Sequence, residues 1–219
     1  MLRITVLNDF RNLKKDTVYD LSALDNLKSM ILVGDNGCGK SSLLQALRGT
    51  KDDTNTNTAG GSLYTTDFKL LQSNINVEHN YEKMFFLDSI KDNGLDLNNA
   101  YDAVEFVNSG GFHTKDRSHG EASLIYLSLF LNKIKNRIVE NKTLIVLDEV
   151  DKGLSLSKQL KMYDIINNLV YKFKVHVLVV SHNALLIQKS EIVFDIEKNG
   201  MEVSSKYLSD KTGTTITLY

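Results

Sequence analysis

The feature that most constrains the fold is a glycine-rich turn between an apolar run and a helix-like stretch. The apolar run is Ser29–Val33, the turn is Gly34–Gly39, and residues Lys40–Arg48 have helical character. The turn and the two residues after it fit the pattern G-x-x-x-x-G-K-[ST]. A buried strand that leads through such a turn into a helix predicts an α/β protein with an anion-binding site at the helix N-terminus.

The chemistry of this turn predicts a nucleotide phosphate site. The glycines allow successive backbone N–H groups to point inward, and the helix adds its positive N-terminal end. Lys40 is expected to reach the β- and γ-phosphates, and Ser41 to ligate Mg²⁺. Cys38 is expected to be a small filler of the loop rather than a redox sensor. The predicted nucleotide-binding set here is Asn36, Gly37, Cys38, Gly39, Lys40, Ser41 and Ser42.

Two further apolar runs end in residues that suit NTP hydrolysis. The run Leu144–Leu147 is followed by Asp148 and Glu149, and the run Val177–Val180 is followed by Ser181 and His182. The carboxyl ends of parallel strands share one edge of the sheet, where ligands bind. Asp148 is expected to hold Mg²⁺, Glu149 to polarise the attacking water, and His182 to contact the γ-phosphate. The predicted catalytic residues are Glu149, His182 and Lys40.

The remaining patterning predicts one domain over residues 1–219, built on a largely parallel sheet. The expected strands are 2–7, 18–21, 29–33, 143–147, 175–180 and 192–196, the last at a sheet edge, with 62–72 and 83–87 as strands of an arm. The expected helices are 40–48, 98–107, 121–137 and 156–172. Ser155 is expected to cap the last helix, whose apolar stripe is Leu156, Leu160, Tyr163, Ile166 and Val170. Residues 51–61 are expected to form a mobile loop.

Composition excludes several classes of protein. There is no proline, although average usage is about 5%; 42% hydrophobic residues argue against disorder, and the lack of heptads argues against a coiled coil. We attribute the missing proline to coding bias. A net charge of −1 gives no strong field for nucleic acid or membrane. No apolar run is long enough for a membrane segment, and one cysteine suits a reducing, cytoplasmic compartment.

A fourth segment, Ser118-His119-Gly120-Glu121, precedes an apolar helix-like stretch. Together the four segments resemble an ABC-type ATPase head, the class shared by transporter nucleotide-binding subunits, SMC proteins and DNA-repair ATPases. The S-H-G-E form is most similar to small stand-alone bacterial and phage ATPases often labelled AAA-family. The resemblance implies a P-loop NTPase fold with a mainly parallel central sheet, an antiparallel β arm, and a helical subdomain, about residues 88–140, that carries the signature motif.

The resemblance also implies a mechanism. Such heads form a head-to-tail homodimer that sandwiches two ATP molecules, with Ser118 and Gly120 contacting the γ-phosphate held by the other protomer. Leu154 and Ser155 would lie between the two sites. ATP binding then joins the protomers and hydrolysis separates them, which makes the dimer a switch for an effector. The implied cofactors are ATP and Mg²⁺.

Several positions and alternatives stay open at this level. The glutamine of the family's Q-loop is missing; Asp88, as a third Mg²⁺ ligand, is the first candidate for that place and Gln72 the second. Phe10 and Arg11, after the first strand, resemble the N-F-R segment at which SMC-like heads approach the nucleotide, so Arg11 is a candidate nucleotide contact. The effector is a protein or DNA. Alternative functions are an ATP-binding regulatory module with little turnover, a DNA-associated repair-type ATPase and, less favoured, a transporter subunit. The basic runs 133–137 and 172–174 are expected to be solvated helix ends.

Overall fold

The structure, a computed structural model, describes residues 1–48, 73–88 and 119–213. The predicted loop 51–61, strand 62–72 and helix 98–107 lie outside these residues, as do Gln72 and Ser118. The helical subdomain therefore stays a prediction, and so does the assignment of the whole chain to a single domain.

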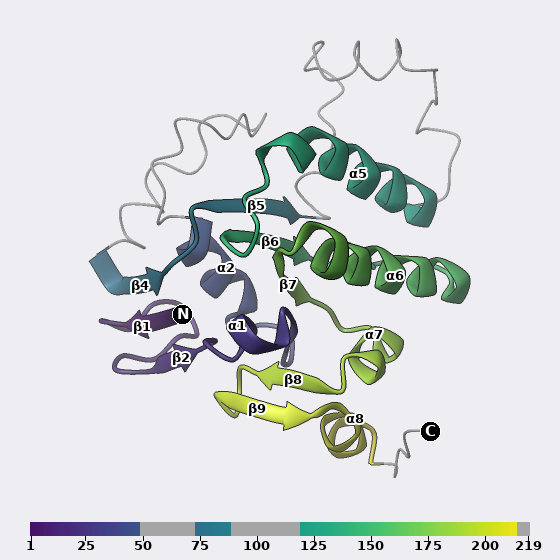
Figure 1. The fold of residues 1–219 in the computed structure, drawn as a ribbon. Coiled ribbons are helices and arrows are strands. Elements are labelled where there is room, and N and C mark those ends of the chain that lie inside the picture. The colour runs from purple at the N-terminus through teal and green to yellow at the C-terminus, as the bar shows by residue number, and fades with distance from the viewer. Residues whose placement is uncertain (49–72, 89–118, 214–219) are drawn as a thin grey trace.

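A six-stranded sheet forms the centre of the molecule (Figure 1). Its order is β5-β6-β7-β3-β8-β9, and all neighbours are parallel except the pair β8 and β9. The strands are β3 (Ser29–Val33), β5 (Lys83–Asp88), β6 (Thr143–Asp148), β7 (His176–Val180), β8 (Ile192–Asp195) and β9 (Gly200–Val203). The predicted mainly parallel α/β sheet is confirmed.

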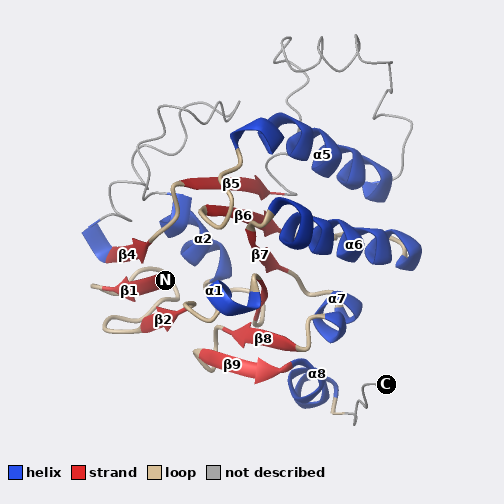
Figure 2. Cartoon of the chain, in the orientation of Figure 1, coloured by secondary structure: helices blue, strands red, loops and turns tan. Residues whose placement is uncertain are grey.

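Both faces of this sheet are covered, which explains the unbroken apolar runs of its strands. In β3, for example, Met30 and Leu32 pack into one core while Ile31 and Val33 pack into the other. The first core lies under α1 (Leu24–Leu27), α2 (Lys40–Arg48) and a second sheet, and the second core lies under the remaining long helices (Figure 2). Those helices are α5 (His119–Ile134), α6 (Leu156–Phe173), α7 (Ala184–Lys189) and α8 (Ser204–Thr212).

The second sheet is antiparallel and has the order β2-β1-β4. Its strands are β1 (Leu2–Val6), β2 (Val18–Asp20) and β4 (Ile75–His79), so the expected antiparallel arm exists. The assignment of residues 83–87 to that arm is wrong. These residues are β5, which pairs with β6 in parallel, Lys83 opposite Thr143. Met84 and Phe85 are both buried, in different cores, and a strand buried on both faces belongs in the central sheet.

Three smaller expectations are also corrected. Strand β8 is not at the edge, because β9 pairs along it. The stretch expected as one helix over 121–137 is α5 followed by a 3-10 turn, Lys135–Arg137. Ser155 occupies the N-cap position of α6, yet among the described residues its side chain makes no capping hydrogen bond; its carbonyl accepts the N–H groups of residues 158 and 159 instead.

The expected apolar stripe of α6 is also only half right. Leu156 and Leu160 are 64% and 42% exposed, while the helix buries Met162, Ile166 and Leu169.

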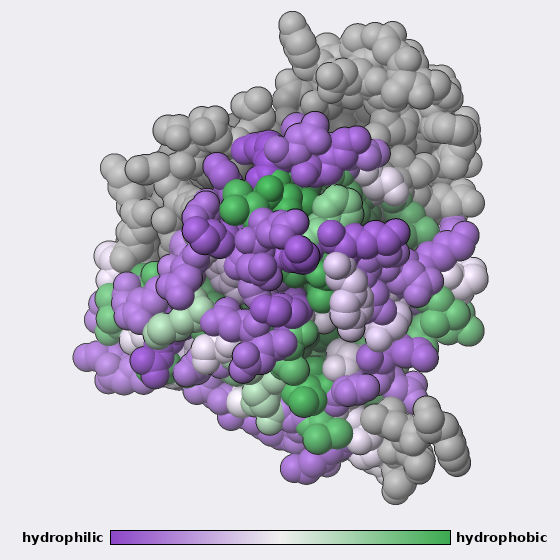
Figure 3. Space-filling model, viewed as in Figure 1, coloured by the Kyte–Doolittle hydropathy of each residue, from purple (hydrophilic) through white to green (hydrophobic). Residues whose placement is uncertain are grey.

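The face in Figure 3 is mostly hydrophilic, with hydrophobic side chains in separate patches. None of the helices in the described ranges is both long enough and apolar enough to span a bilayer.

Candidate functional site

The predicted site residues follow neighbouring strands at one edge of the central sheet. The glycine-rich loop follows β3, His182 follows β7 after Ser181, and Asp148 ends β6 with Glu149 directly after it. Because β7 lies between β3 and β6, its end stands between the loop and the two acids. The topology therefore brings together the three motifs that the sequence places far apart.

Lys40 lies inside the glycine-rich loop. Its side chain is 6% exposed, and its Nζ donates to the carbonyl oxygens of Gly34 at 2.7 Å and Asp35 at 2.8 Å. The sulfur of Cys38 is 3.7 Å from the same nitrogen. Burial raises the pKa of the Cys38 thiol, with Lys40 opposing the shift, so the neutral thiol fits the predicted filler role. The lysine ammonium is thus held within the curve of the loop.

Two glycines of this loop are required by close packing. Gly39 has φ +112°, and a Cβ at this position would lie 2.4 Å from Leu13 Cδ2. Gly34 has φ +142°, and its Cβ would lie 2.6 Å from Ile196 Cγ2 and 2.7 Å from Cys38 Sγ. The loop is therefore packed from two sides, by the segment after β1 and by the end of β8, in a conformation that side chains disfavour.

The segment after β1 contacts the loop and α2. The side-chain amide of Asn12 donates to the carbonyl oxygen of Gly37. Arg11 adopts φ +52°, and its Nη1 donates to Gln45 Oε1 on α2 at 3.0 Å. The Arg11 guanidinium also lies 5.2 Å from the centre of the Phe10 ring. Arg11 is thereby placed beside the phosphate-loop helix, and its contact with a nucleotide stays a prediction.

Glu149 and His182 face each other across the ends of β6 and β7. Glu149 Oε1 is 3.6 Å from His182 Nε2, and its other oxygen is 3.7 Å from Lys152 Nζ. Glu149 has φ +49°, a left-handed conformation that costs a non-glycine residue about 1–2 kcal/mol. Its N–H donates to Val180 O at 3.0 Å, which ties the strained residue to β7. Backbone strain of this kind is common at functional sites.

The surroundings of His182 favour its neutral form. The side chain of His182 is 41% exposed, and its partial loss of solvent lowers its pKa below the usual value. The positive charge of Lys40 lowers the pKa further, against the raising effect of Glu149. A neutral imidazole has one N–H donor and one acceptor nitrogen. His182 can therefore donate one hydrogen bond and accept another at neutral pH, and the charge of Lys40 favours this neutral form.

A buried polar pair connects the loops that carry Glu149 and His182. Ser181 Oγ is fully buried and donates to Asp151 Oδ2 at 2.7 Å, and it accepts the N–H of Asn183 at 2.9 Å. Asp151 is 6% exposed, and burial raises the pKa of its carboxyl despite the hydrogen bond from Ser181. The side chain of Asn183 accepts the N–H groups of residues 185 and 186 and caps α7.

Two of the three predicted metal ligands end neighbouring strands at the same edge of the sheet, and the third, Ser41, lies in the first turn of α2. Asp88 is the last residue of β5 and is the register partner of Asp148 on β6. Carboxylate and hydroxyl oxygens are the ligands that Mg²⁺ takes in nucleotide sites, so Ser41, Asp88 and Asp148 fit that cation. Within the described ranges, no three His, Cys, Asp or Glu side chains gather as a metal site. Ser41, Asp88 and Asp148 would therefore suit an ion that takes its remaining ligands from phosphate oxygens and water.

The signature segment is only partly within the described residues. Gly120 lies in the first turn of α5, and Ser118 precedes the described part of that helix. Of the nucleotide-binding set, Asn36, Gly37 and Ser41 are exposed and Ser42 is buried. The roles assigned to these residues stay predictions, as do the catalytic roles.

Sequence reasoning missed the residues that support the loop from a distance. The Asn12 amide, the Leu13 side chain and the pair Asp151–Ser181 each contact a motif residue or its neighbour. Lys211 on α8 pairs with Asp35 of the loop. Only Asp151 carried a local signal, as a third acid after the strand that ends at Asp148; the others depend on contacts between distant segments.

Comparison with known proteins gives a consistent result. The sequence profile of the ABC transporter family matches residues 23–152. None of the curated proteins compared with the chain matches it. A metal-chelate type ABC transporter in an inward-facing conformation shares 17% identity and a TM-score of 0.56, covering 95% of this chain and 87% of that one. CbiO1 from Clostridium perfringens, part of the ABC transporter complex cbiONQ, shares 14% identity and a TM-score of 0.50, covering 96% and 91%.

Proposed function

This chain belongs to the ABC transporter family of ATPases, and we propose that it hydrolyses ATP at the carboxyl edge of its central sheet to operate a dimeric switch. ATP hydrolysis is the activity of the family. The observation that carries the assignment to this edge is the approach of Glu149 to His182, 3.6 Å apart, at the strand ends beside the loop that holds Lys40. The short, heptad-free stretch between Lys40 and Asp148 argues against a rod-like SMC or repair protein, and the S-H-G-E form favours a stand-alone switch over a transporter subunit.

Each residue has a distinct task in this proposal. The loop N–H groups and Lys40 bind the β- and γ-phosphates, and Ser41, Asp148 and Asp88 would hold Mg²⁺. Glu149 accepts a hydrogen bond from the attacking water and orients it toward the γ-phosphate. His182 donates a hydrogen bond to the γ-phosphate or to that water. When bound, Mg²⁺ neutralises charge on the β- and γ-phosphate oxygens.

Dimerisation is supported by exposed apolar side chains beside the site. Leu156 and Leu160 lie one turn apart at the start of α6 and are 64% and 42% exposed. Leu156 directly follows Leu154 and Ser155, which the family resemblance places between the two sites of a head-to-tail dimer. Two exposed leucines one turn apart make an apolar strip on one helix face, which a second copy would bury. The signature residues Ser118 and Gly120 of that copy would then contact the γ-phosphate.

The decisive experiment compares wild type with Glu149→Gln. Phosphate release and size-exclusion behaviour are measured with and without ATP and Mg²⁺, with Glu140→Gln as a control because Glu140 is exposed and pairs with Lys174. We expect Glu149→Gln to release little phosphate and to accumulate as an ATP-dependent dimer. Glu140→Gln should behave like wild type. If the wild type dimerises with ATP but releases no phosphate, the proposed enzymatic function is wrong and the chain is a regulatory ATP-binding module.

A transporter ATPase subunit is the second candidate, favoured by the family match over residues 23–152. It would require a membrane-embedded partner that stimulates phosphate release. The DNA-associated alternative requires an affinity for duplex DNA that falls steeply as salt rises. A phosphate-release assay with added duplex DNA at low and high salt separates it from the switch, which needs no DNA for turnover.

A further inference from the structure

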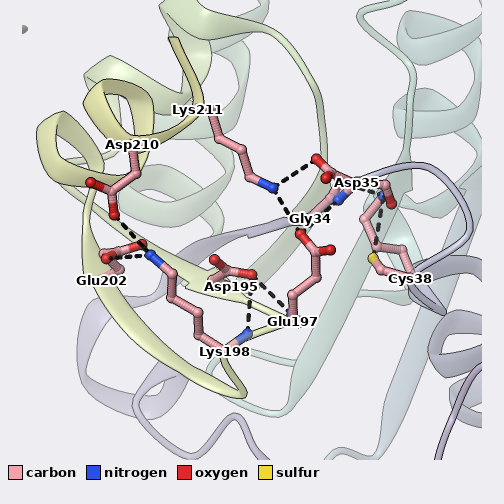
Figure 4. A network of polar contacts seen from close by, with 10 residues as sticks. Gly34, Asp35, Cys38, Asp195, Glu197, Lys198, Glu202, Asp210 and Lys211 are labelled. Carbon is pink, nitrogen blue, oxygen red and sulfur yellow. Dashed lines mark hydrogen bonds and ion pairs between the residues drawn. The ribbon is translucent and has the colours of Figure 1, made fainter. Parts of the chain in front are cut away.

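The C-terminal helix α8 contacts the phosphate loop through an ion-pair network (Figure 4). Lys211 Nζ lies 2.7 Å from Asp35 Oδ1 and 2.9 Å from Glu197 Oε2. The same Glu197 oxygen accepts the backbone N–H of Asp35 at 3.1 Å. One lysine therefore bridges the loop that follows β3 and the turn that follows β8. Helix α8 lies outside the segment that matches the family profile.

The position of Lys211 is fixed by the packing of α8. Tyr207 and Leu208 are each 6% exposed and belong to the second core, and the Lys211 ammonium lies 5.9 Å from the centre of the Tyr207 ring. Lys198, in the turn between β8 and β9, adds a second link to the helix. Its Nζ lies 2.9 Å from Asp210 Oδ2 of α8 and 3.0 Å from Glu202 Oε1 of β9. Lys211 therefore approaches Asp35 from a helix that is packed against the core and tied to β9.

The charges of this network bear directly on phosphate binding. Asp35 belongs to the loop that is proposed to receive the phosphates, and its carbonyl accepts from Lys40 at 2.8 Å. The hydrogen bond from Lys211 lowers the pKa of both Asp35 and Glu197, so both carboxyls carry negative charge at neutral pH. Two carboxylates beside an anion site oppose phosphate binding, and Lys211 is the cation that offsets them.

We propose that Lys211 is a positioning residue for nucleotide binding, which neutralises Asp35 and Glu197 and holds the phosphate loop in its binding conformation. The inference rests on the proposed function, because it presumes that the loop binds ATP. It adds a control on that site from the C-terminal helix. A partner or a modification that removes the charge of Lys211 would weaken ATP binding without touching the residues that perform hydrolysis.

The test uses charge-specific variants of the full chain. Lys211→Gln removes the cation, Lys211→Arg keeps it, and Lys211→Gln combined with Asp35→Asn removes the acid that it neutralises. Lys206→Gln is the matched control, because Lys206 is also on α8, is 69% exposed and pairs with Glu202 instead. ATP affinity is measured by calorimetric titration, kcat and KM by phosphate release, and folding by circular dichroism.

We expect Lys211→Gln to weaken ATP binding and raise KM about two- to five-fold, the range of an exposed ion pair, with kcat unchanged. Lys211→Arg and the double variant should restore the affinity. The difference should shrink between about 0.1 M and about 1 M salt, as the Debye length falls from about 10 Å to about 3 Å. A merely structural role would change the unfolding temperature without this salt dependence or rescue.

Three results overturn the inference. These are an unchanged affinity in Lys211→Gln, an equal loss in Lys206→Gln, and a loss that Asp35→Asn does not restore. If Lys211→Gln fails to fold, Asp35→Asn alone decides, because relieving the acid must then leave ATP binding as tight as in wild type or tighter. A wild type that binds no ATP defeats the proposed function itself, which distinguishes that failure from a failure of the role of Lys211.

Discussion

Removing the hydroxyl of Ser181 should destabilise the protein far more than an ordinary serine substitution. Ser181 Oγ donates to Asp151 Oδ2 at 2.7 Å and accepts the Asn183 N–H at 2.9 Å, all in a fully buried position. Ser181→Ala leaves one oxygen of a buried carboxylate and one backbone N–H without these partners. Such groups lose their water on folding and gain nothing in return.

The magnitude follows from these two contacts. A hydrogen bond to a charged group contributes about 1.5–3 kcal/mol, so we expect Ser181→Ala to lower the free energy of unfolding by about 2–3 kcal/mol. For a domain of this size that corresponds to about 4–12 °C in unfolding temperature. Asp151→Asn keeps an oxygen acceptor and removes a buried charge, so its cost should stay below about 1 kcal/mol.

The assay is urea unfolding followed by far-ultraviolet circular dichroism, because the chain has no tryptophan. Ser157→Ala is the control, since Ser157 is exposed and has only a 3.3 Å contact with Ser155. The double variant Ser181→Ala with Asp151→Asn should cost less than the sum of the singles, by about 1–2 kcal/mol. Equal stability of Ser181→Ala and Ser157→Ala would refute the reasoning, as would strict additivity.

Three further predictions concern packing, pH and assembly. Gly39→Ala should lose about 2–4 kcal/mol of stability and bind ATP poorly, because of φ +112° and the 2.4 Å approach to Leu13 Cδ2; Gly213→Ala, at φ +66° with no atom of the described chain within 4 Å, should lose only about 1 kcal/mol in the same denaturation assay. Burial and the charge of Lys28 lower the pKa of His176, so its contribution to stability is present above about pH 6.5, the unfolded value, and is lost as pH falls toward the folded pKa. The unfolding temperature should therefore drop between about pH 7 and about pH 5, and His176→Phe should flatten that part of the curve; an unaltered slope would contradict the assignment. Leu160→Glu should abolish the ATP-dependent dimer on sizing while leaving the unfolding temperature of the monomer unchanged, because Leu160 is 42% exposed.

The parts of the fold that the sequence predicts well are those with local signals. The bounds of α2 and β3 match the expected residues, because a glycine-rich turn, an apolar run and a helical pattern lie in one short stretch. The three strand ends of the site also follow from the sequence, since one apolar run stops at the glycine-rich turn and the other two stop at polar residues. Alternation of residues between two cores then produces the uninterrupted apolar runs.

The parts that failed depend on partners far away in the chain. Lys83–Asp88 has the pattern of any buried strand, and only its pairing with Thr143–Asp148 places it in the central sheet. Helix α8 has a polar sequence, and its burial of Tyr207 and Leu208 becomes evident only once β8 and α7 stand beside it. The exposure of Leu156 and Leu160 shows the limit of an apolar stripe, which predicts burial without saying in what.

Where proline is absent, other contacts hold the motif turns. The resemblance to the S-H-G-E group of ATPases implies proline at the positions where this sequence has Val150 and Ala184. Val150 is 3% exposed and packs into the second core, so hydrophobic burial fixes the turn after Glu149. Ala184 is exposed at the start of α7, and the side chain of Asn183 fixes that turn by capping the helix. Packing therefore takes the place of proline at the first position, and a hydrogen-bonded cap takes its place at the second.

The strand order also has a consequence during synthesis on the ribosome. Strand β3 delivers the phosphate loop, yet its neighbours in the sheet are β7 and β8, with Ser29 opposite Val177 and Ile31 opposite Val193. The loop is therefore made long before the two strands that flank β3. Contacts of such long sequence separation slow folding. A nascent chain that ends before His176 therefore lacks both flanks of β3, and nucleotide binding should be acquired only after β7 and β8 have been made.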